Sequence, residues 1–280
     1  MGPLPPGTDD RAIWDIWESQ FTLPAVTVAD ELGIFRHTGD RAMTTAELAS
    51  ATEVNERALG ILLGALASLG MVEKRDNRWS ATPPARMWLH PDAEGYWGGF
   101  LFRFRETIPI HADLIAMVRS GKRPDNKVAG GPEWERGTMS AEVARRISDF
   151  MHAHSMGPAR GVAVQQVFGE VKSLLDVGCG SGVYGIEFAR ANPQMAVTLL
   201  DLKEMVAEAQ KHVDAAGLQD RVATCGLNMF EQDWPTGHDA HFFANIFHDW
   251  SEETNAILAA KSYKALEPGG RIFLHEILMD

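Results

Sequence analysis

The stretch LLDVGCGSGVYG, Leu174 to Gly185, decides the fold of this 280-residue chain, and it fits two nucleotide-binding patterns. Gly180, Gly182 and Gly185 match the G-x-G-x-x-G loop that holds a pyrophosphate in dinucleotide folds. Read two residues earlier, the same stretch matches an acidic residue followed by alternate glycines: Asp176, Gly178, Gly180 and Gly182. Both patterns predict a strand, a glycine loop and a helix. The choice between them concerns the ligand.

The chain around this stretch alternates short apolar runs with helical patterns. Five runs between residues 173 and 277 predict strands: SLLDV, AVTLLD, RVATCG, DAHFFANIF and RIFLHEI. Helices are expected to begin near Gly182, Glu204 and Glu252. Nearly continuous apolar strands separated by helices are typical of a parallel sheet that is covered on both faces. The second half of the chain is therefore predicted to be an α/β, Rossmann-like domain.

Polar side chains stand at or just after the ends of the predicted strands: Asp176, Asp201, Asn228, His248 and Glu276. In parallel sheets the ligand lies beyond these carboxyl ends. Asp176 would repel a pyrophosphate but attract a ligand that carries an ammonium and a sulfonium, which favours S-adenosylmethionine. Asp201 can accept hydrogen bonds from ribose hydroxyls of either ligand. An NAD-dependent oxidoreductase is the less favoured alternative.

The first half of the chain predicts a winged-helix arrangement. A helical pattern runs from Ala12 to Leu32, and a second helix begins near Thr44 or Thr45. Asn55 is expected to cap a third helix that Gly70 ends, and a hairpin follows around Asp76.

Winged helices often bind DNA, but this one lacks the charge to do so. Arg57 is the only basic residue of the helix that would enter a groove, and phosphate contacts need several. The Ala12–Leu32 helix carries more apolar surface than so small a module can bury. A role in dimerisation, with a second copy covering that helix, is the favoured interpretation.

Composition and charge argue against several further classes of protein. The formal net charge is −12 and the isoelectric point is near 5.3, which argues against nucleic acid or acidic membranes as partners. No apolar run is long enough for a membrane-spanning helix. The amino terminus shows no signal pattern, so a cytoplasmic location is expected. With Cys179 and Cys225 as its only cysteines, the chain is expected to have neither a disulfide framework nor a metal site.

Three regions are predicted from these patterns. Residues 1–100 form the winged-helix dimerisation domain, residues 101–165 a helical connector that contributes to a substrate pocket, and residues 166–280 the cofactor-binding domain. Within the connector, Lys122 to Pro132 is predicted to be a loop. The candidate pocket residues are Phe150, Met151 and His154, although such side chains more often belong to a core.

Two further segments, FANIFHDWSEE after the fourth strand and ALEPGGRIFLHE into the fifth, complete a recognisable set of motifs. With the glycine loop and the amino-terminal VADELGIF, MTTAELA and LLGALASLGMVE, they resemble S-adenosylmethionine-dependent O-methyltransferases of the plant caffeic-acid and bacterial secondary-metabolite type. The resemblance runs from Ile13 to the last residue. It implies a class I methyltransferase sheet, S-adenosylmethionine as cofactor, a small-molecule acceptor, and a homodimer formed by the amino-terminal domain.

The resemblance also implies which residues bind the cofactor. Gly178 and Gly180 would surround its methionine part, and Asp201 with Leu202 would bind the ribose. Asn228 and Met229 match the family's Asp-Met pair at the adenine, where Asn keeps an acceptor but loses the charge. Ser155 matches a family serine that reaches the cofactor.

The resemblance assigns catalysis to three residues. His248 matches the general base and Glu276 the carboxylate that orients it, while Asp249 is placed near the substrate. Methyl transfer needs an aligned acceptor and the removal of its proton. A hydroxyl acceptor is favoured. An S-, N- or C-methyltransferase of the same architecture, or a homologue that binds the cofactor without catalysis, remains an alternative.

The family normally continues beyond the fifth strand with an antiparallel pair, whereas this chain stops at Asp280. The sheet is therefore expected to be truncated at its carboxyl end, with RIFLHEI as an exposed apolar edge. Three explanations are open at this point: the chain was cut, a separate polypeptide completes the sheet, or activity has been lost.

Overall fold

The computed structural model describes residues 11–105, 107–122, 134 and 136–276. The chain divides into two compact units, with the boundary between Asp125 and Asn126. The boundary falls within the stretch expected to be a connector, so that its helices belong to different units. The predicted loop from Lys122 to Pro132 lies outside the described residues except for Lys122 itself.

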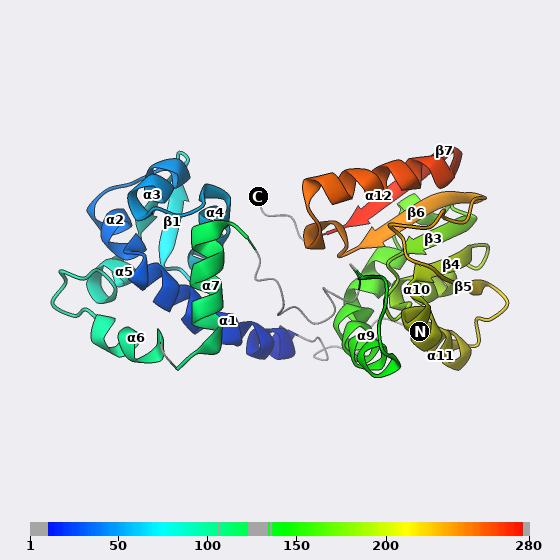
Figure 1. The fold of residues 1–280 in the computed structure, drawn as a ribbon, viewed down its shortest axis with the longest axis horizontal. Helices are drawn as coiled ribbons and strands as arrows, with labels where there is room; N and C mark the ends of the chain where they lie inside the picture. The colour runs from blue at the N-terminus through cyan, green and yellow to red at the C-terminus, as the bar shows by residue number, and fades with distance from the viewer. Residues whose placement is uncertain (1–10, 106, 123–133, 135, 277–280) are drawn as a thin grey trace. The chain divides into compact units, whose positions relative to one another are not determined.

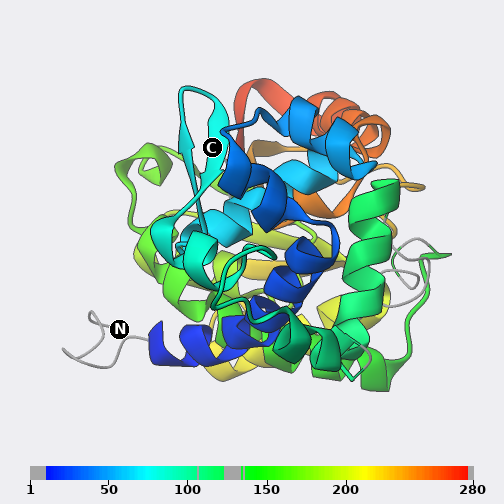
Figure 2. The ribbon, with the colours of Figure 1, turned by 90° about the vertical axis from the view of Figure 1, so that its left-hand side faces the viewer.

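The first unit is mainly helical, with one short hairpin (Figure 1). Its elements are α1 (Arg11–Glu31), α2 (Ile34–Asp40), α3 (Thr45–Thr52), α4 (Glu56–Ser68), β1 (Val72–Arg75), β2 (Arg78–Ala81), α5 (Pro83–Trp88), α6 (Gly98–Arg105) and α7 (Pro109–Ser120). Two views of the unit show α7 beside the carboxyl-terminal half of α1 (Figures 1 and 2).

Local sequence signals account for the helix and turn boundaries of this unit. Thr44 caps α3 in a capping box with Glu47, and the Asn55 side chain accepts a hydrogen bond from the first turn of α4. Asp76 and Asn77 both have positive φ in the two-residue turn between β1 and β2. These caps and the hairpin were predicted and are confirmed.

The core of the first unit gathers around α4, whereas the amino-terminal half of α1 is uncovered. Four leucines of α4 are buried: Leu59, Leu62, Leu63 and Leu66. In that half of α1, Ile13 and Ile16 are 68% and 69% exposed. Trp17 and Phe21 continue this exposed face. Such a face is typical of a surface that another chain covers.

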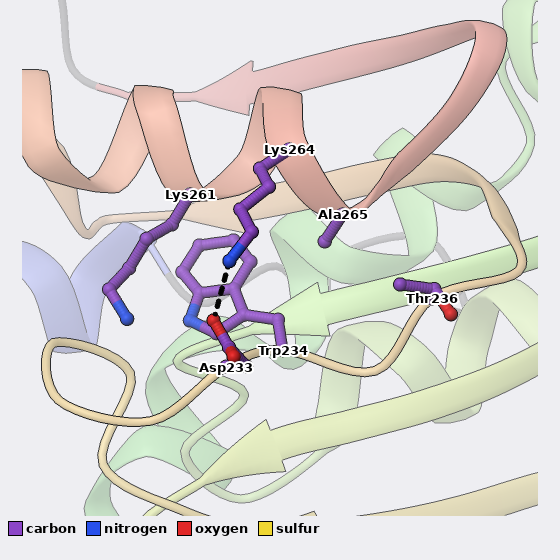
Figure 3. Close-up of a pocket in the computed structure, with 6 residues that line it drawn as sticks. All are labelled: Asp233, Trp234, Thr236, Lys261, Lys264 and Ala265. Atoms are coloured by element: carbon purple, nitrogen blue, oxygen red, sulfur yellow. Dashed lines mark hydrogen bonds and ion pairs between the residues drawn. The ribbon is translucent and has the colours of Figure 1, made fainter.

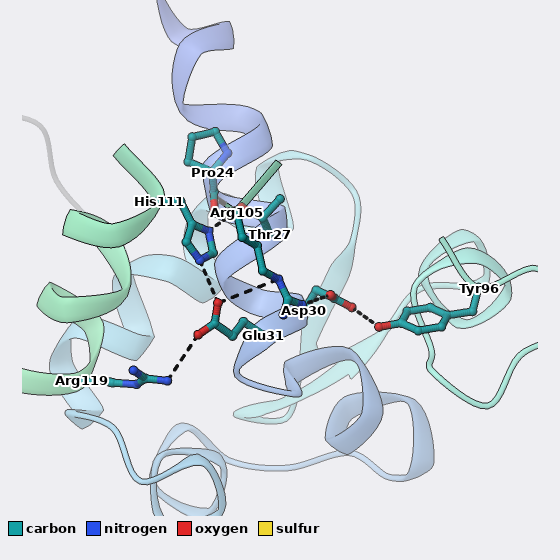
Figure 4. Close-up of polar contacts among 8 residues, drawn as sticks. All are labelled: Pro24, Thr27, Asp30, Glu31, Tyr96, Arg105, His111 and Arg119. Carbon is teal, nitrogen blue, oxygen red and sulfur yellow. Dashed lines mark hydrogen bonds and ion pairs between the residues drawn. The ribbon is translucent and has the colours of Figure 1, made fainter. Parts of the chain in front are cut away.

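A buried polar network joins α1 to α6 and α7 (Figure 4). Asp30, with its side chain 2% exposed, accepts hydrogen bonds from the Arg105 guanidinium and, at 2.7 Å, from the Tyr96 hydroxyl. Glu31 lies 2.8 Å from Nε2 of His111. Burial and the Asp30 charge raise the pKa of Tyr96 to about 12. The carboxylates of this unit's interior are thus neutralised by its own side chains.

The second unit is a five-stranded parallel sheet with helices on both faces (Figure 1). Its elements are α9 (Ala141–Ala163), η1 (Gln166–Phe168), β3 (Ser173–Val177), α10 (Val183–Ala191), β4 (Ala196–Asp201), α11 (Lys203–Ala216), β5 (Val222–Gly226), β6 (His238–Ala244), η2 (Phe247–Asp249), α12 (Glu252–Ala265) and β7 (Leu266–His275). The strand order is β5-β4-β3-β6-β7. The α/β, Rossmann-like fold class is confirmed.

Alternate residues of the strands pack into two separate cores. Leu174 and Phe242 join the helices α9, α10 and α11 on one face of the sheet. Leu175 and Phe243 join Leu258 of α12 on the other. Because successive side chains of a strand point to opposite faces, continuous apolar runs were the correct signal for a sheet buried on both sides.

The structure corrects the predicted ends of two strands. The fourth predicted strand extended to Phe247, but β6 ends at Ala244 because Asn245 takes a left-handed conformation with φ of 56°. Pairing of β7 begins at Leu266, before the predicted Pro-Gly turn, and is interrupted by a bulge where Gly269 has φ of 83°.

The β7 strand forms an edge of the sheet. Its Ile272 and Leu274 side chains are 41% and 54% exposed, so the predicted apolar edge is confirmed. In the described part of the chain, no helix combines the length and apolar character needed to cross a membrane.

Candidate functional site

The glycine loop between β3 and α10 is built from left-handed backbone. Gly178, Gly180 and Gly182 have φ of 70°, 54° and 76°, values that L side chains rarely adopt. Gly185 has a different task, because a Cβ there would come 2.3 Å from the Leu199 side chain. Close packing of α10 on the sheet therefore explains the third glycine of the dinucleotide-like pattern without a pyrophosphate.

Asp176 lies at the end of β3 beneath this loop. Its side chain is buried, and Oδ2 accepts a hydrogen bond of 3.1 Å from the backbone N–H of Gly185. Burial, reinforced by the charge of Asp201, raises its pKa to about 7, although the Gly185 N–H opposes this. Among the described residues it has no Lys or Arg partner.

Asp201 ends β4 and is also buried. Its Oδ2 accepts from the backbone N–H of Gly180 at 2.9 Å. Its Oδ1 accepts from the N–H of Leu202 at 2.7 Å and from Nε1 of Trp134 at 3.3 Å. Burial raises the pKa of Asp201 despite these three donors. This carboxylate ties the loop to the start of α11 without an ion pair to Lys or Arg in the described chain.

Asn228 and Met229 follow β5 at the same edge of the sheet. Oδ1 of Asn228 accepts from the N–H of Phe230 at 3.0 Å, and the Met229 carbonyl accepts from Nε1 of Trp234 at 2.8 Å. The Asn228 amide nitrogen faces Gly137, where a Cβ would approach it to 2.5 Å. The two residues are therefore held by their own turn and by the segment that precedes α9.

His248 lies in the η2 turn that follows β6, beside Glu276 at the end of β7. Nδ1 of His248 is 2.7 Å from Oε2 of Glu276. The other carboxylate oxygen, Oε1, accepts from the backbone N–H groups of Ile246 and Phe247 at 2.8 Å each. The imidazole is 47% exposed, and its Nε2 lies 3.8 Å from Oδ1 of Asp249. The turn thus fixes the carboxylate, and the carboxylate fixes the histidine.

Ile246 connects this group to the glycine loop. A Cβ on Gly178 would come 2.5 Å from Cδ1 of Ile246, so the two are in direct contact. The structure therefore brings together the predicted cofactor residues of β3 and β4 and the predicted catalytic residues of β6 and β7.

The residues predicted on α9 have different surroundings. Met151 lies 3.9 Å from the Cβ position of Gly180, against the loop. Phe150 is 48% exposed and packs on His154 at a ring separation of 5.3 Å. Ser155 is buried and hydrogen-bonded to Nδ1 of His154 at 3.0 Å.

Sequence reasoning missed two residues of the site. Tyr184 on α10 shares a hydrogen bond with Ser155, and its hydroxyl is 3.2 Å from Nδ1 of His275. Burial raises the pKa of Tyr184 to about 12. Trp134 reaches Asp201 from 67 positions away. Neither has a local signal, because both contacts join segments that are distant in sequence.

A cavity of about 170 Å³ lies elsewhere in the second unit (Figure 3). It is lined by residues before β6 and at the end of α12: Asp233, Trp234, Thr236, Lys261, Lys264 and Ala265. These segments lead into the amino ends of β6 and β7, the opposite edge from the glycine loop. Lys264 is paired with Asp233 at 2.9 Å, and Lys261 donates to the Gln232 carbonyl. The cavity is therefore separate from the candidate site.

The fold and the loop define a class of adenosyl-ligand-binding protein. S-Adenosylmethionine fits these residues. The buried Asp176, which has no Lys or Arg partner among the described residues, suits a ligand with a sulfonium and an ammonium, and Asp201 can accept from its ribose hydroxyls. A pyrophosphate at the glycine loop would meet the Asp176 carboxylate and be repelled.

Comparison with known proteins identifies the family. The profile of the O-methyltransferase domain matches residues 111–280, and that of the O-methyltransferase dimerisation domain matches residues 16–91. A 3-hydroxy-5-methyl-1-naphthoate 3-O-methyltransferase from Streptomyces sahachiroi is 30% identical over 269 residues, which cover 95% of this chain and 75% of that protein. An L-tyrosine C(3)-methyltransferase from Streptomyces lavendulae is 27% identical, covering 89% and 69%.

The solved structures agree on the fold. An O-methyltransferase family 2 protein from Planctomyces limnophilus, in complex with apigenin, superimposes with a TM-score of 0.78 at 23% identity, covering 99% of this chain and 80% of that one. This chain belongs to the O-methyltransferase family of S-adenosylmethionine-dependent methyltransferases.

Proposed function

We propose that this chain transfers a methyl group from S-adenosylmethionine to a hydroxyl of an aromatic small molecule, with His248 as the general base. The observation that carries the proposal is the 2.7 Å contact between Nδ1 of His248 and Glu276. A carboxylate can only accept hydrogen bonds, so Nδ1 carries the hydrogen and the neutral ring has its lone pair on Nε2. Nε2 is then the atom that removes the acceptor's proton.

Glu276 acts as a positioning residue in this proposal. Its Oε1 is held by two backbone N–H groups and its Oε2 by the imidazole, so the ring cannot rotate without breaking a charge-assisted hydrogen bond. After proton transfer the same carboxylate stabilises the imidazolium. Asp249, 3.8 Å from Nε2, adds negative charge on the side that faces the acceptor.

The cofactor would be held by the residues at the carboxyl ends of β3, β4 and β5. When bound, it supplies a methyl group already activated by the sulfonium. Gly178 and Gly180 provide backbone without side chains, and Asp176 provides negative charge below the loop. Asp201, held by the N–H group of Leu202, offers acceptors for the ribose, which Leu202 borders. Asn228 and Met229 border the adenine, and Ser155 reaches the cofactor from α9.

A hydroxyl acceptor is supported by the relative whose name specifies methylation at an aromatic oxygen. The L-tyrosine C(3)-methyltransferase keeps ring carbon as the second candidate acceptor atom. Met151 and Phe150 on α9, with His154, are proposed to border the acceptor. Of the three, Met151 has the strongest support, since it lies against the glycine loop.

Calorimetry tests the cofactor. We expect S-adenosylmethionine and S-adenosylhomocysteine to bind, and NAD⁺ not to bind under the same conditions. Binding of NAD⁺ with no response to either adenosyl ligand would contradict the proposal at its base.

Methyl transfer from labelled cofactor tests the base and the acceptor together. With 3-hydroxy-5-methyl-1-naphthoate and a panel of phenols, thiols and amines, we expect label in a phenol. His248→Ala should lower kcat by roughly 10²–10⁴-fold, the usual contribution of a general base. The control is His90→Ala, which removes another His–carboxylate pair, at 3.2 Å from Asp40 in the first unit. If His248→Ala transferred methyl groups at the parent rate, the general-base role of His248 would be refuted. If the parent chain bound the cofactor without any methyl transfer, a non-catalytic homologue would be favoured.

The three-region division and the homodimer are part of the same proposal. The dimerisation-domain match and the exposed face of α1 support pairing of two copies through the first unit. Replacing Ile13 and Ile16 together by Glu should convert a dimer into a monomer in size-exclusion chromatography with light scattering. If the parent chain is already a monomer, the proposed homodimer is refuted, whereas the proposed methyl transfer is not.

A further inference from the structure

Asp201 receives more hydrogen bonds in this structure than its proposed ribose contact allows. A carboxylate offers about four acceptor positions, two on each oxygen. Here Oδ1 accepts from both Leu202 and Trp134, and Oδ2 accepts from Gly180. One position remains, on Oδ2. A ribose that donates one hydroxyl to each oxygen needs a position on Oδ1 as well.

Of the three donors, only the indole of Trp134 is free to leave. The N–H groups of Gly180 and Leu202 belong to backbone that the sheet and the start of α11 fix in place. The Trp134 contact is also the longest, at 3.3 Å against 2.7 and 2.9 Å. A side-chain donor at that distance is the weakest bond of the three.

The surroundings of Trp134 keep it over this carboxylate. The half-buried Trp134 ring packs against a hydrophobic cluster that includes Met139, Leu202 and Met205. Three residues further along, Gly137 touches the amide of Asn228, the residue proposed at the adenine. The stretch that bears Trp134 therefore meets both residues proposed to bind the nucleoside.

We propose that Trp134 competes with the cofactor ribose for hydrogen bonding to Asp201. In the ligand-free chain its indole N–H holds Oδ1. When an adenosyl ligand enters, the N–H yields that position to a ribose hydroxyl, while the ring stays packed on Leu202 and Met205. Trp134 thereby lowers the affinity for both the cofactor and its demethylated product. This inference rests on the proposed function, because it needs an adenosyl ligand at Asp201.

The test compares binding of S-adenosylhomocysteine by calorimetry in three chains. Trp134→Phe keeps an aromatic ring but removes the competing donor, and we expect it to bind about three- to tenfold more tightly, the range of one net hydrogen bond. The matched control is Trp79→Phe, which also loses one indole hydrogen bond, to Thr45 at 3.0 Å in the first unit. Its affinity should equal that of the parent. Unchanged or weaker binding by Trp134→Phe overturns the proposal.

A second measurement uses the parent chain and needs no stable variant at position 134. In a spectrum of ¹⁵N-labelled tryptophan, the Trp134 indole cross-peak is assigned as the one that Trp134→Phe lacks, or by elimination. It should shift when S-adenosylhomocysteine saturates the chain, while the Trp79 cross-peak stays in place. A stationary Trp134 cross-peak at saturation overturns the proposal. Failure of the parent itself to bind S-adenosylhomocysteine would instead refute the proposed function, and this inference with it.

Discussion

The two units bury carboxylates in opposite ways. In the first unit Asp30 and Glu31 are surrounded by Arg105, His111 and Tyr96, so their charge is neutralised inside the unit. In the second, the hydrogen bonds that Asp176 and Asp201 accept from described residues all come from backbone and indole N–H groups. Leaving a buried charge without a partner costs several kcal/mol. The contrast teaches that burial of a carboxylate is not enough to suggest a ligand site; the missing counter-charge in the second unit is what supports the proposed one.

The largest expected effect is the loss of stability when the buried Asp30–Arg105 ion pair is broken. Asp30→Ala leaves Arg105 without its partner in a mostly buried position, which should destabilise the first unit by about 3 kcal/mol. In hydrogen exchange the amides of α4 should then exchange roughly 100-fold faster. The amides of α10 in the second unit serve as an internal reference.

A matched variant calibrates this result. Asp92→Ala breaks the exposed pair with Arg36, at 3.0 Å, and should cost less than about 1 kcal/mol. Binding of S-adenosylhomocysteine should be the same in both variants. Loss of binding in Asp30→Ala with unchanged exchange would reverse the assigned roles of the two units.

The next effect concerns Asp201. Asp201→Asn removes one of the two carboxylate oxygens that the ribose is proposed to use, and it should weaken S-adenosylmethionine and S-adenosylhomocysteine equally, by about 2 kcal/mol or roughly 30-fold. Calorimetry with both ligands measures this. A loss confined to S-adenosylmethionine would mean that Asp201 senses the sulfonium charge rather than the ribose.

The smallest effect follows from the titration of Asp176. Its pKa in the folded chain is raised to about 7, so the side chain carries a proton below that pH and a negative charge above it. Only S-adenosylmethionine has the extra positive charge of the sulfonium. The ratio of the chain's affinity for S-adenosylmethionine to its affinity for S-adenosylhomocysteine should therefore rise about three- to tenfold between about pH 6 and about pH 8.

The raised pKa of Asp176 also determines whether the free energy of unfolding rises or falls with pH. Because the folded chain holds a proton that the unfolded chain releases near pH 4, the free energy of unfolding should fall as the pH rises from about 4 to about 7 and then level off. Asp176→Asn should abolish both the pH-dependent ligand preference and this loss of stability. An affinity ratio that does not change with pH in the parent would show that Asp176 does not face the ligand's charge.

Much of the fold could be predicted because its signals are local. The caps at Thr44 and Asn55, the turn at Asp76 and the apolar runs of the strands each depend on a few neighbouring residues. The end of β6 was misjudged because the apolar run continues to Phe247, while the left-handed Asn245 breaks the strand. His248 follows three residues after that break, within hydrogen-bond distance of Glu276.

The candidate site was predictable to the extent that its residues follow strands. The ends of parallel strands meet at one edge, so Asp176, Asp201 and His248 could be grouped without a structure. Tyr184 and Trp134 could not, because a hydrogen bond between distant segments leaves no periodic trace in the sequence. The contact between Gly178 and Ile246 escaped prediction for the same reason.

The position of Glu276 has one more consequence. It directly follows β7, the strand whose outer backbone groups are unpaired in the described chain and whose Ile272 and Leu274 are exposed. A displacement of the end of β7 would move Glu276 and, through the 2.7 Å contact, the imidazole of His248. We therefore expect a strand docked along β7 to hold Glu276, and with it the proposed base, more firmly in place.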